Sequence, residues 1–354
     1  MSALQQGQAR PRSLRRFDAD QRWLAALVGI LIAELLVFNL SISGFWSGSG
    51  SSGWLGTETF TFTSIIALGV MFVIFTGDID LSVGALAGFS GIVMGELHLG
   101  GMNIWLAVVI ALLVSAGIGL LQGLIITFFK LESLLVTLAG QFILGASSVA
   151  YEGAVPPSSF PHTFVKVFGT GTVVGIPNQL LIFAALALLS VLIVHRTRFG
   201  RQLVLVGHNR DAAAYAGIRV SLTRVRAFTL SGLFAGIAGV IIAATFNSVT
   251  DYIGTPLLLP AITAVVLGGV NIFGGSGRVA GVIIATFILG LLTIGLLDDG
   301  VGNNATSMAT GVLLLGALTV KGVMDRRMGL PSLIDRLRGR FPPAAPSANS
   351  PDMT

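Results

Sequence analysis

Residues 60–97 read FTFTSIIALGVMFVIFTGDIDLSVGALAGFSGIVMGEL, and they contain the most informative short segment of the chain. Two short apolar runs, 60–76 and 81–97, flank a polar connection that carries Asp78 and Asp80. Charge between apolar helices is expensive and marks either function or a solvated turn. In the first interpretation, Asp80 caps the next helix and Asp78 is exposed to water at the cytoplasmic edge. In the second, which is compatible with the first, the connection lines or gates a path, and the two runs are broken or re-entrant helices.

The composition extends this apolar pattern to the whole chain. Of its 354 residues, 53% are hydrophobic and 10% are charged, whereas an average soluble domain carries about 25% charge. The charged side chains are too few to cover a soluble protein of this size, and the apolar excess excludes a disordered chain. Cysteine is absent, which excludes disulfides and Cys-ligated metals. The 46 glycines fit a bundle of closely packed apolar helices.

Ten apolar segments are candidates for crossing a bilayer. The first follows a basic start and could be a signal peptide, but its length and the lack of a clean cleavage site favour an uncleaved span. The candidate spans are 23–43, 60–76, 81–97, 104–128, 134–151, 179–194, 227–245, 257–273, 279–297 and 305–320.

The distribution of basic residues predicts the orientation of these spans. A net charge of +5 could suggest a nucleic-acid partner, but the basic residues cluster between apolar runs. An even number of spans places every Lys and Arg except Lys166 on one side, as the positive-inside rule requires of the cytoplasmic side. We therefore predict an all-α polytopic membrane protein of about ten transmembrane helices, with both termini cytoplasmic and no nucleic-acid partner. Its predicted parts are a cytoplasmic segment 1–22, a transmembrane domain 23–325 and a cytoplasmic tail 326–354, disordered after residue 341.

Enzyme and cofactor motifs fail when each is tested. A Walker A loop needs Gly-Lys-Ser/Thr, and no lysine of this chain follows a glycine. Residues 48–53 match G-x-G-x-x-G, but they lie in an outside loop without a preceding strand. The four histidines lack the spacing of metal ligands. The sequence therefore predicts no catalytic residues, no cofactor site and no metal site in this chain.

Two further segments at the predicted cytoplasmic side are candidates for function. The loop 195–226 (HRTRFGRQLVLVGHNRDAAAYAGIRVSLTRVR) contains a short Ala-rich helix at 211–217 with an acidic start and a Gly stop. The positive-inside rule by itself would explain the arginines of this loop. It does not require a capped helix, and the capped helix favours docking of a soluble partner. The segment 268–278 (GGVNIFGGSGR) cannot hold an ordinary helix. It is either a tight hairpin with positive φ values or a hinge at Gly268, Gly269, Gly274 and Gly275.

Ionisable residues are scarce inside the spans. Glu34 and Glu96 are the only carboxylates there, whereas proton- or sodium-coupled carriers keep a buried ionisable relay. This disfavours a secondary carrier without excluding it. In-span polar residues such as Gln122 and Gln141 more often join helices to one another than bind a ligand.

Three motifs together resemble the permease subunits of bacterial ATP-binding-cassette importers for monosaccharides, the type that takes ribose, xylose, rhamnose or autoinducer-2. They are Ile-Asp-Leu-Ser-Val-Gly at 79–84, the loop motif at 197–220, and the Gly-rich segment at 261–278. The chain departs from the family pattern in two places. Asp78 stands where the family commonly has Gly, and Leu-Leu-Pro-Ala-Ile at 258–262 replaces a segment that commonly carries two acids.

The resemblance implies a type II importer-like subunit in the bacterial inner membrane, paired with itself or a close relative. A periplasmic sugar-binding protein would deliver a monosaccharide or a similar small neutral polyol, and a separate cytoplasmic ATPase would hold ATP and Mg²⁺. The chain itself would be a transport subunit and no enzyme. The residues that match the family's coupling loop are Gly207, Asn209, Ala212, Ala213, Gly217 and Ile218. The candidate pathway residues are Asp78, Asp80, Ser82, Gln141 and Asn271. An ion-coupled carrier or facilitator, and a non-transporting membrane scaffold, remain the alternatives.

Overall fold

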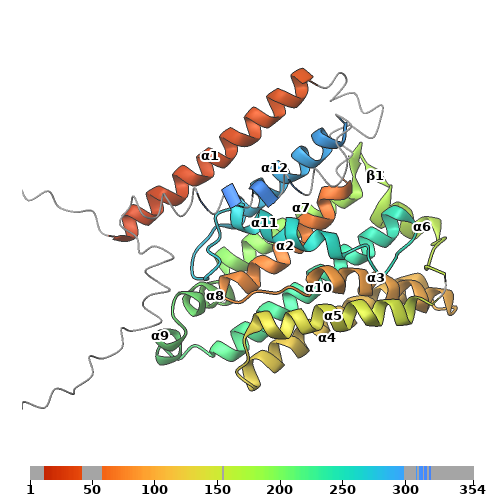
Figure 1. Cartoon of the computed structure of the whole chain (residues 1–354), viewed down its shortest axis with the longest axis horizontal. Helices are drawn as coiled ribbons and strands as arrows, with labels where there is room; N and C mark the ends of the chain where they lie inside the picture. Colours follow the sequence, from red (N-terminus) through yellow and green to blue (C-terminus); the bar gives the residue numbers. More distant parts are fainter. Residues whose placement is uncertain are drawn as a thin grey trace, which may run out of the picture.

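The computed structural model describes residues 12–41, 58–153 and 155–298, with a few further helical positions between 308 and 319. Its long helices lie side by side, and the short helices α8 and α9 are at one end of the bundle (Figure 1). The long elements are α1 (Arg12–Ser41), α2 (Glu58–Phe75), α3 (Val83–Leu99), α4 (Ile104–Phe128), α5 (Ser133–Glu152), α7 (Asn178–Arg196), α10 (Val220–Phe246), α11 (Leu258–Leu267) and α12 (Val279–Asp298).

Short elements complete the two ends of the bundle. At one end are α8 (Arg198–His208) and α9 (Arg210–Tyr215). At the other are α6 (His162–Phe164), the π-turn η1 (Val165–Gly169) and an antiparallel pair of β1 (Thr172–Val173) with β2 (Ile176–Pro177). The 3₁₀ turn η2 (Thr255–Leu257) lies against the start of α3.

Each predicted span up to residue 297 coincides with a helix. Five helices are long and apolar enough to cross a membrane, and shorter apolar helices lie at 60–75, 83–99, 255–267 and 279–294 among the described residues. The predicted span 257–273 is too long, because α11 ends at Leu267, where Gly268 and Gly269 begin an irregular segment. Most of the span 305–320, the Gly/Ser-rich stretch 47–53 and the predicted disordered tail lie outside the described residues.

Helix α10 is the centre of the bundle and packs against α2, α3 and α4. Small residues allow this close approach. A Cβ atom on Gly119 of α4 would overlap the Phe228 carbonyl of α10, and a Cβ on Gly239 of α10 would overlap the Ala87 carbonyl of α3. The glycine content is therefore partly explained by helices whose backbones touch.

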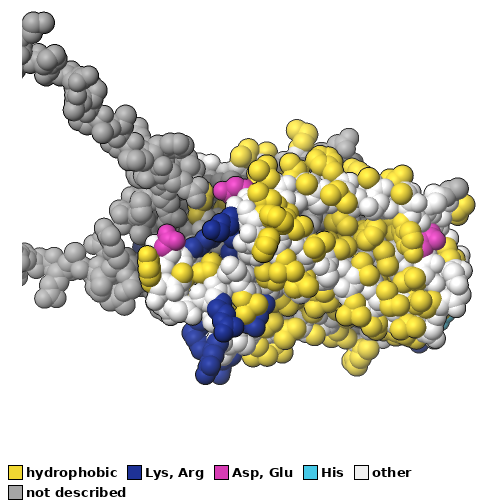
Figure 2. Space-filling view, turned by 90° about the horizontal axis from the view of Figure 1, so that it is seen from below, with side chains coloured by type: hydrophobic (Ala, Val, Ile, Leu, Met, Phe, Trp, Pro, Cys, Tyr) yellow, Lys and Arg dark blue, Asp and Glu magenta, His cyan; other side chains and the backbone are white. Residues whose placement is uncertain are grey.

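The flank of the bundle is apolar. Figure 2 shows hydrophobic side chains over its length and Lys and Arg side chains gathered toward one end. Large apolar side chains on α5 that face outward include Leu134, Leu135, Phe142 and Ile143. Soluble monomers rarely expose contiguous apolar surface on this scale, so the flank fits contact with lipid or with another membrane subunit.

Candidate functional site

Three segments that are far apart in the sequence meet backbone to backbone at the end of the bundle that carries α8 and α9. The Gly275 N–H donates a hydrogen bond of 3.1 Å to the Phe75 carbonyl at the end of α2. A Cβ on Gly207 of α8 would overlap that same carbonyl and lie 2.5 Å from the Gly275 nitrogen. A Cβ on Gly274 would lie 2.5 Å from the Gly77 nitrogen. We call Gly77, Gly207, Gly274 and Gly275 the glycine junction.

The backbone conformations at the junction explain why glycine is required there. Gly77, Gly274 and Gly275 have φ values of 74°, 82° and 76°, a region that residues with a Cβ rarely adopt. Gly77 ends α2 in a Schellman arrangement, in which its N–H donates to the Ile74 carbonyl and the Asp78 N–H donates to the Val73 carbonyl. The four positions therefore need glycine for conformation, for close approach, or for both.

Helix α9 is the short capped helix that the sequence predicts. The Asn209 side chain accepts a hydrogen bond of 2.9 Å from the Ala212 N–H at its start. At its end, Gly217 has a φ of 79°, and the Ile218 N–H donates to the Ala213 carbonyl. Ala212 is exposed and Ala213 is buried, so one face of α9 is available to a partner while the other packs on the bundle.

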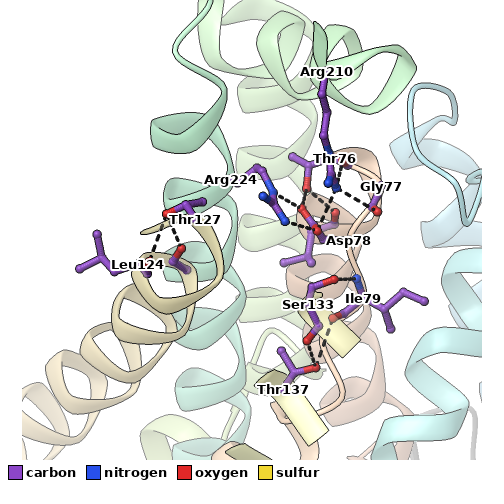
Figure 3. Close-up of polar contacts among 12 residues, drawn as sticks. Thr76, Gly77, Asp78, Ile79, Leu124, Thr127, Ser133, Thr137, Arg210 and Arg224 are labelled. Atoms are coloured by element: carbon purple, nitrogen blue, oxygen red, sulfur yellow. Dashed lines mark hydrogen bonds and ion pairs between the residues drawn. The ribbon is translucent and has the colours of Figure 1, made fainter. Parts of the chain in front are cut away.

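Asp78 joins α9 and α10 to the connection between α2 and α3 (Figure 3). Arg224 of α10 holds its carboxylate in two places, with Nε 2.7 Å from Oδ2 and one terminal nitrogen 2.6 Å from Oδ1. Arg210 of α9 donates to the same Oδ1 at 3.0 Å, and the Thr76 hydroxyl donates to Oδ2 at 2.9 Å. The expectation that Asp78 is exposed to water is wrong, because its side chain is only 2% exposed.

The electrostatics of Asp78 follow from this arrangement. Burial alone would raise the pKa of Asp78, but hydrogen bonding to Arg224 and the charges of Arg224 and Arg210 outweigh burial and hold the pKa below its ordinary value. The carboxylate is therefore ionised at neutral pH. A buried charge is tolerated where it is paired and hydrogen-bonded in this way.

Asp80 lies deeper and has neutral partners. Its Oδ1 accepts hydrogen bonds from the Ser82 N–H at 3.0 Å and the Ser82 hydroxyl at 2.7 Å, and its Oδ2 accepts one from the Ser231 hydroxyl of α10 at 2.8 Å. The Ser82 hydroxyl also lies 3.1 Å from Oε1 of Gln122 on α4. The expectation that Asp80 is the N-cap is wrong by two residues, because Ser82 is the N-cap of α3 and Asp80 accepts its N–H.

The backbone between the two carboxylates is held by α5. The Ile79 N–H donates to the Ser133 hydroxyl at 3.2 Å, and the Thr137 hydroxyl donates to the Ile79 carbonyl at 3.3 Å. These α5 residues are four positions apart and so share one face of the helix. Residues 78–80 are therefore held between α10 on one side and α5 on the other.

The remaining predicted residues are not among the hydrogen-bond partners of Asp78. Gln141 is half-buried on α5, one helical turn beyond Thr137. Asn271 shapes the turn after α11, where its side chain accepts from the Phe273 N–H at 3.1 Å. A Cβ on Gly268 would lie 2.5 Å from the Val282 nitrogen of α12, and Gly269 packs under the Trp23 ring. Gly268 and Gly269 thus hold the end of α11 against α12 and α1.

The sequence interpretation missed Arg210, Arg224 and Ser231 as partners of the acidic connection. A signal for two of them exists in the spacing. Arg224 and Ser231 are seven residues apart and share a face of α10, while Asp78 and Asp80 are two residues apart in an extended segment and point to the same side. Asp78 therefore faces Arg224, and Asp80 faces Ser231, along the same side of α10.

Apolar helices with lipid-compatible flanks, together with a capped basic segment joined to them at one end, define a membrane-embedded helical protein with an exposed basic segment at that end. Comparison with known proteins agrees. Residues 54–320 match the family described as "Branched-chain amino acid transport system / permease component". The chain is 32% identical over 327 residues to the autoinducer 2 import system permease protein LsrD of Photorhabdus luminescens, covering 90% of this chain and 96% of the relative.

A second relative gives the same result. LsrD of Yersinia enterocolitica is 34% identical over 302 residues, covering 83% of this chain and 89% of the relative. The chain belongs to this permease family, as the motifs in the sequence indicate. It is the membrane-spanning permease subunit of a bacterial ATP-binding-cassette importer, in the inner membrane. A solved structure of PsaBC from Streptococcus pneumoniae in complex with Fab aligns over 87% of this chain and 99% of that chain, at 18% identity and a TM-score of 0.42.

Proposed function

We propose that the chain imports a monosaccharide or a similar small neutral polyol by alternating access, driven by a separate ATPase that holds ATP and Mg²⁺ and docks on α8 and α9. In this proposal a periplasmic sugar-binding protein delivers the substrate, and a second permease subunit, identical or closely related, completes the pathway. About ten spans then place both termini in the cytoplasm. The observation that carries the proposal is the glycine junction, because it joins the exposed docking segment to transmembrane helices without intervening side chains.

The junction supports a direct mechanical route. Displacement of α9 by the ATPase moves α8, and Gly207 of α8 lies against the Phe75 carbonyl and Gly275. The end of α2 and the turn between α11 and α12 must then shift together. Backbone contacts of this kind pass a displacement on directly, because no change of side-chain rotamer can absorb the movement. Hinge-like glycines beside the contact, Gly274 and Gly275, accommodate the change in φ and ψ.

The choice of a sugar-like substrate rests on the relatives and on charge. The family description names branched-chain amino acids, whereas the relatives that cover most of this chain are autoinducer 2 permeases. An amino acid at neutral pH carries two charges, and a pathway for it needs charged or dipolar partners. In the described part of the chain, the carboxylates at 78 and 80 are already engaged by the protein's own groups, which favours a neutral substrate.

Reconstitution tests the proposal. The full chain is placed in liposomes with its ATPase and binding protein, and uptake of labelled ribose, autoinducer 2 and leucine is measured with and without ATP. We expect ATP-dependent uptake of ribose or autoinducer 2 but not of leucine, and equal uptake by the Glu34→Gln variant. Transport by the purified chain alone down a sodium or proton gradient, lost in Glu34→Gln, would establish the carrier alternative instead. Reporter fusions at the two termini test the orientation.

A further inference from the structure

We propose that Asp78 is a positioning residue that transmits the position of the docking helix α9 to α5 and α10, with Arg224 as its fixed partner and Arg210 as its exchangeable partner. This inference rests on the proposed function. It goes further by assigning the link to one carboxylate.

The two arginines hold Asp78 in different ways. Arg224 forms a bidentate pair, its side chain is 11% exposed, and it lies in the second turn of α10. Arg210 reaches Oδ1 with a single nitrogen, and its side chain is 43% exposed. A bidentate, buried pair fixes geometry, whereas a single solvent-accessible contact is weaker. The Arg210 contact is therefore the one whose geometry changes with the position of α9, while the Arg224 pair stays formed.

Arg210 also holds the end of α2. The nitrogen that pairs with Asp78 lies 3.3 Å from the Thr76 carbonyl and 3.3 Å from the Gly77 carbonyl. Carbonyls at a helix C-terminus lack intrahelical donors and carry partial negative charge. One guanidinium at the start of α9 therefore contacts both the carboxylate and the carbonyls at the C-terminal end of α2.

From Asp78 the link continues into two helices. Asp78 and Asp80 pair with Arg224 and Ser231 on one face of α10, and Ile79 between them is hydrogen-bonded to Ser133 of α5. Any shift of Asp78 therefore pulls on α10 and α5 together. These contacts run beside the glycine junction, which passes through α8 and the turn after α11, and the two meet at Gly77, whose carbonyl lies 3.3 Å from Arg210.

The decisive variant is Arg210→Met, because it keeps the length of the side chain and leaves Asp78 paired with Arg224, so the fold is preserved. Asp78→Asn is the second variant. Glu132→Gln is the matched control, since Glu132 is an exposed acid just before α5 and caps no helix N–H. Each is assembled with its ATPase and binding protein in liposomes. Three quantities are measured: affinity for the ATPase, stimulation of ATP hydrolysis by the loaded binding protein, and labelled ribose or autoinducer 2 imported per ATP.

We expect Arg210→Met and Asp78→Asn to lower the stimulation and the import per ATP by about 5-fold or more, the lower end of typical coupling between sites. Affinity for the ATPase should stay within about twofold, because the exposed face of α9 is unchanged. Arg210→Lys should restore part of the coupling, since an ammonium keeps the charge but not the three-way contact.

Wild-type import per ATP in Arg210→Met overturns the inference, and so does an equal loss in Glu132→Gln. If Asp78→Asn fails to fold, Arg210→Met decides alone. A wild-type assembly that shows no ATP-dependent uptake is a failure of the proposed function, and it is separated from these outcomes because it appears before any substitution is made.

Discussion

Replacing Gly207 with alanine tests the glycine junction most directly. The added Cβ would overlap the Phe75 carbonyl and lie 2.5 Å from the Gly275 nitrogen. Both neighbours are backbone atoms, so no side-chain rotation relieves the clash. Either α8 moves away from α2, or the hydrogen bond from the Gly275 N–H to the Phe75 carbonyl breaks.

The size of the effect follows from these two contributions. Overpacking in a close-packed interior costs about 1–3 kcal/mol, and a lost backbone hydrogen bond costs about 1 kcal/mol. The higher helix propensity of alanine offsets up to about 1 kcal/mol of this loss of stability, because residue 207 lies within α8. The net expectation is a loss of about 1–3 kcal/mol of stability, with transport reduced further because α8 is displaced from the end of α2.

Thermal unfolding of the purified protein in detergent and ATP-driven uptake in liposomes measure the two consequences. Gly117→Ala is the control, since a Cβ at that position of α4 meets nothing within 4 Å. The control should melt at or slightly above the wild-type temperature and transport normally. Gly207→Ala with wild-type melting and wild-type uptake would refute the close backbone contact on which the mechanical route depends.

Three further predictions concern other contacts. Because the pKa of Asp78 lies below its ordinary value, its ion pairs stabilise the protein above about pH 4 and lose that effect as pH falls through the lowered pKa. The difference in melting temperature between wild type and Asp78→Asn should therefore shrink below pH 4. A constant difference from pH 7 to 3 would contradict this. Gly217→Ala forces a side chain into a φ of 79° with open space around it, at a cost of about 1–2 kcal/mol. It should therefore weaken ATPase binding without altering the melting of the bundle, and unchanged binding would count against α9 as the docking helix. Trp23→Phe removes the donor to the Leu267 carbonyl and should lower stability by about 1 kcal/mol, which unchanged melting would disprove.

The sequence predicted the helices well where each is an apolar run, but it placed the starts of α1 and α10 too late, because their first turns carry charged residues. Ile104–Phe128 and Asn178–Arg196 match the predicted segments almost to the residue. The error at α11 has a local cause, since Val270, Ile272 and Phe273 kept the apolar pattern running past two glycines that end the helix. A hydropathy average taken over a window does not detect such a break, because the break depends on the backbone conformation that glycine allows.

The convergence of the three motifs was beyond the reach of sequence reasoning. Residues 77, 207 and 274 were each recognised as unusual, but for separate reasons: a polar connection, a docking loop and a hinge. Nothing in a single sequence states that their backbones touch, because glycine contacts leave no side chain whose chemistry would point to a partner. A tertiary structure is needed to show that one constraint explains all three positions.

The carboxylate at position 78 could have been matched to a partner by charge accounting. A buried carboxylate needs a cation, and the start of α10 offers two, Arg224 and Arg226, of which Arg224 is largely buried and Arg226 is exposed. The same reasoning applies in reverse. With glycine at position 78, Arg224 would be an almost buried guanidinium without its counter-charge, and that is a costlier state than either the pair or two neutral residues. Asp78 and Arg224 are thus a unit, each tolerated because the other is present. Arg210, which is 43% exposed, can exchange its contact with the carboxylate for water at lower cost, so in the proposed link it is the partner that changes while Arg224 stays bound.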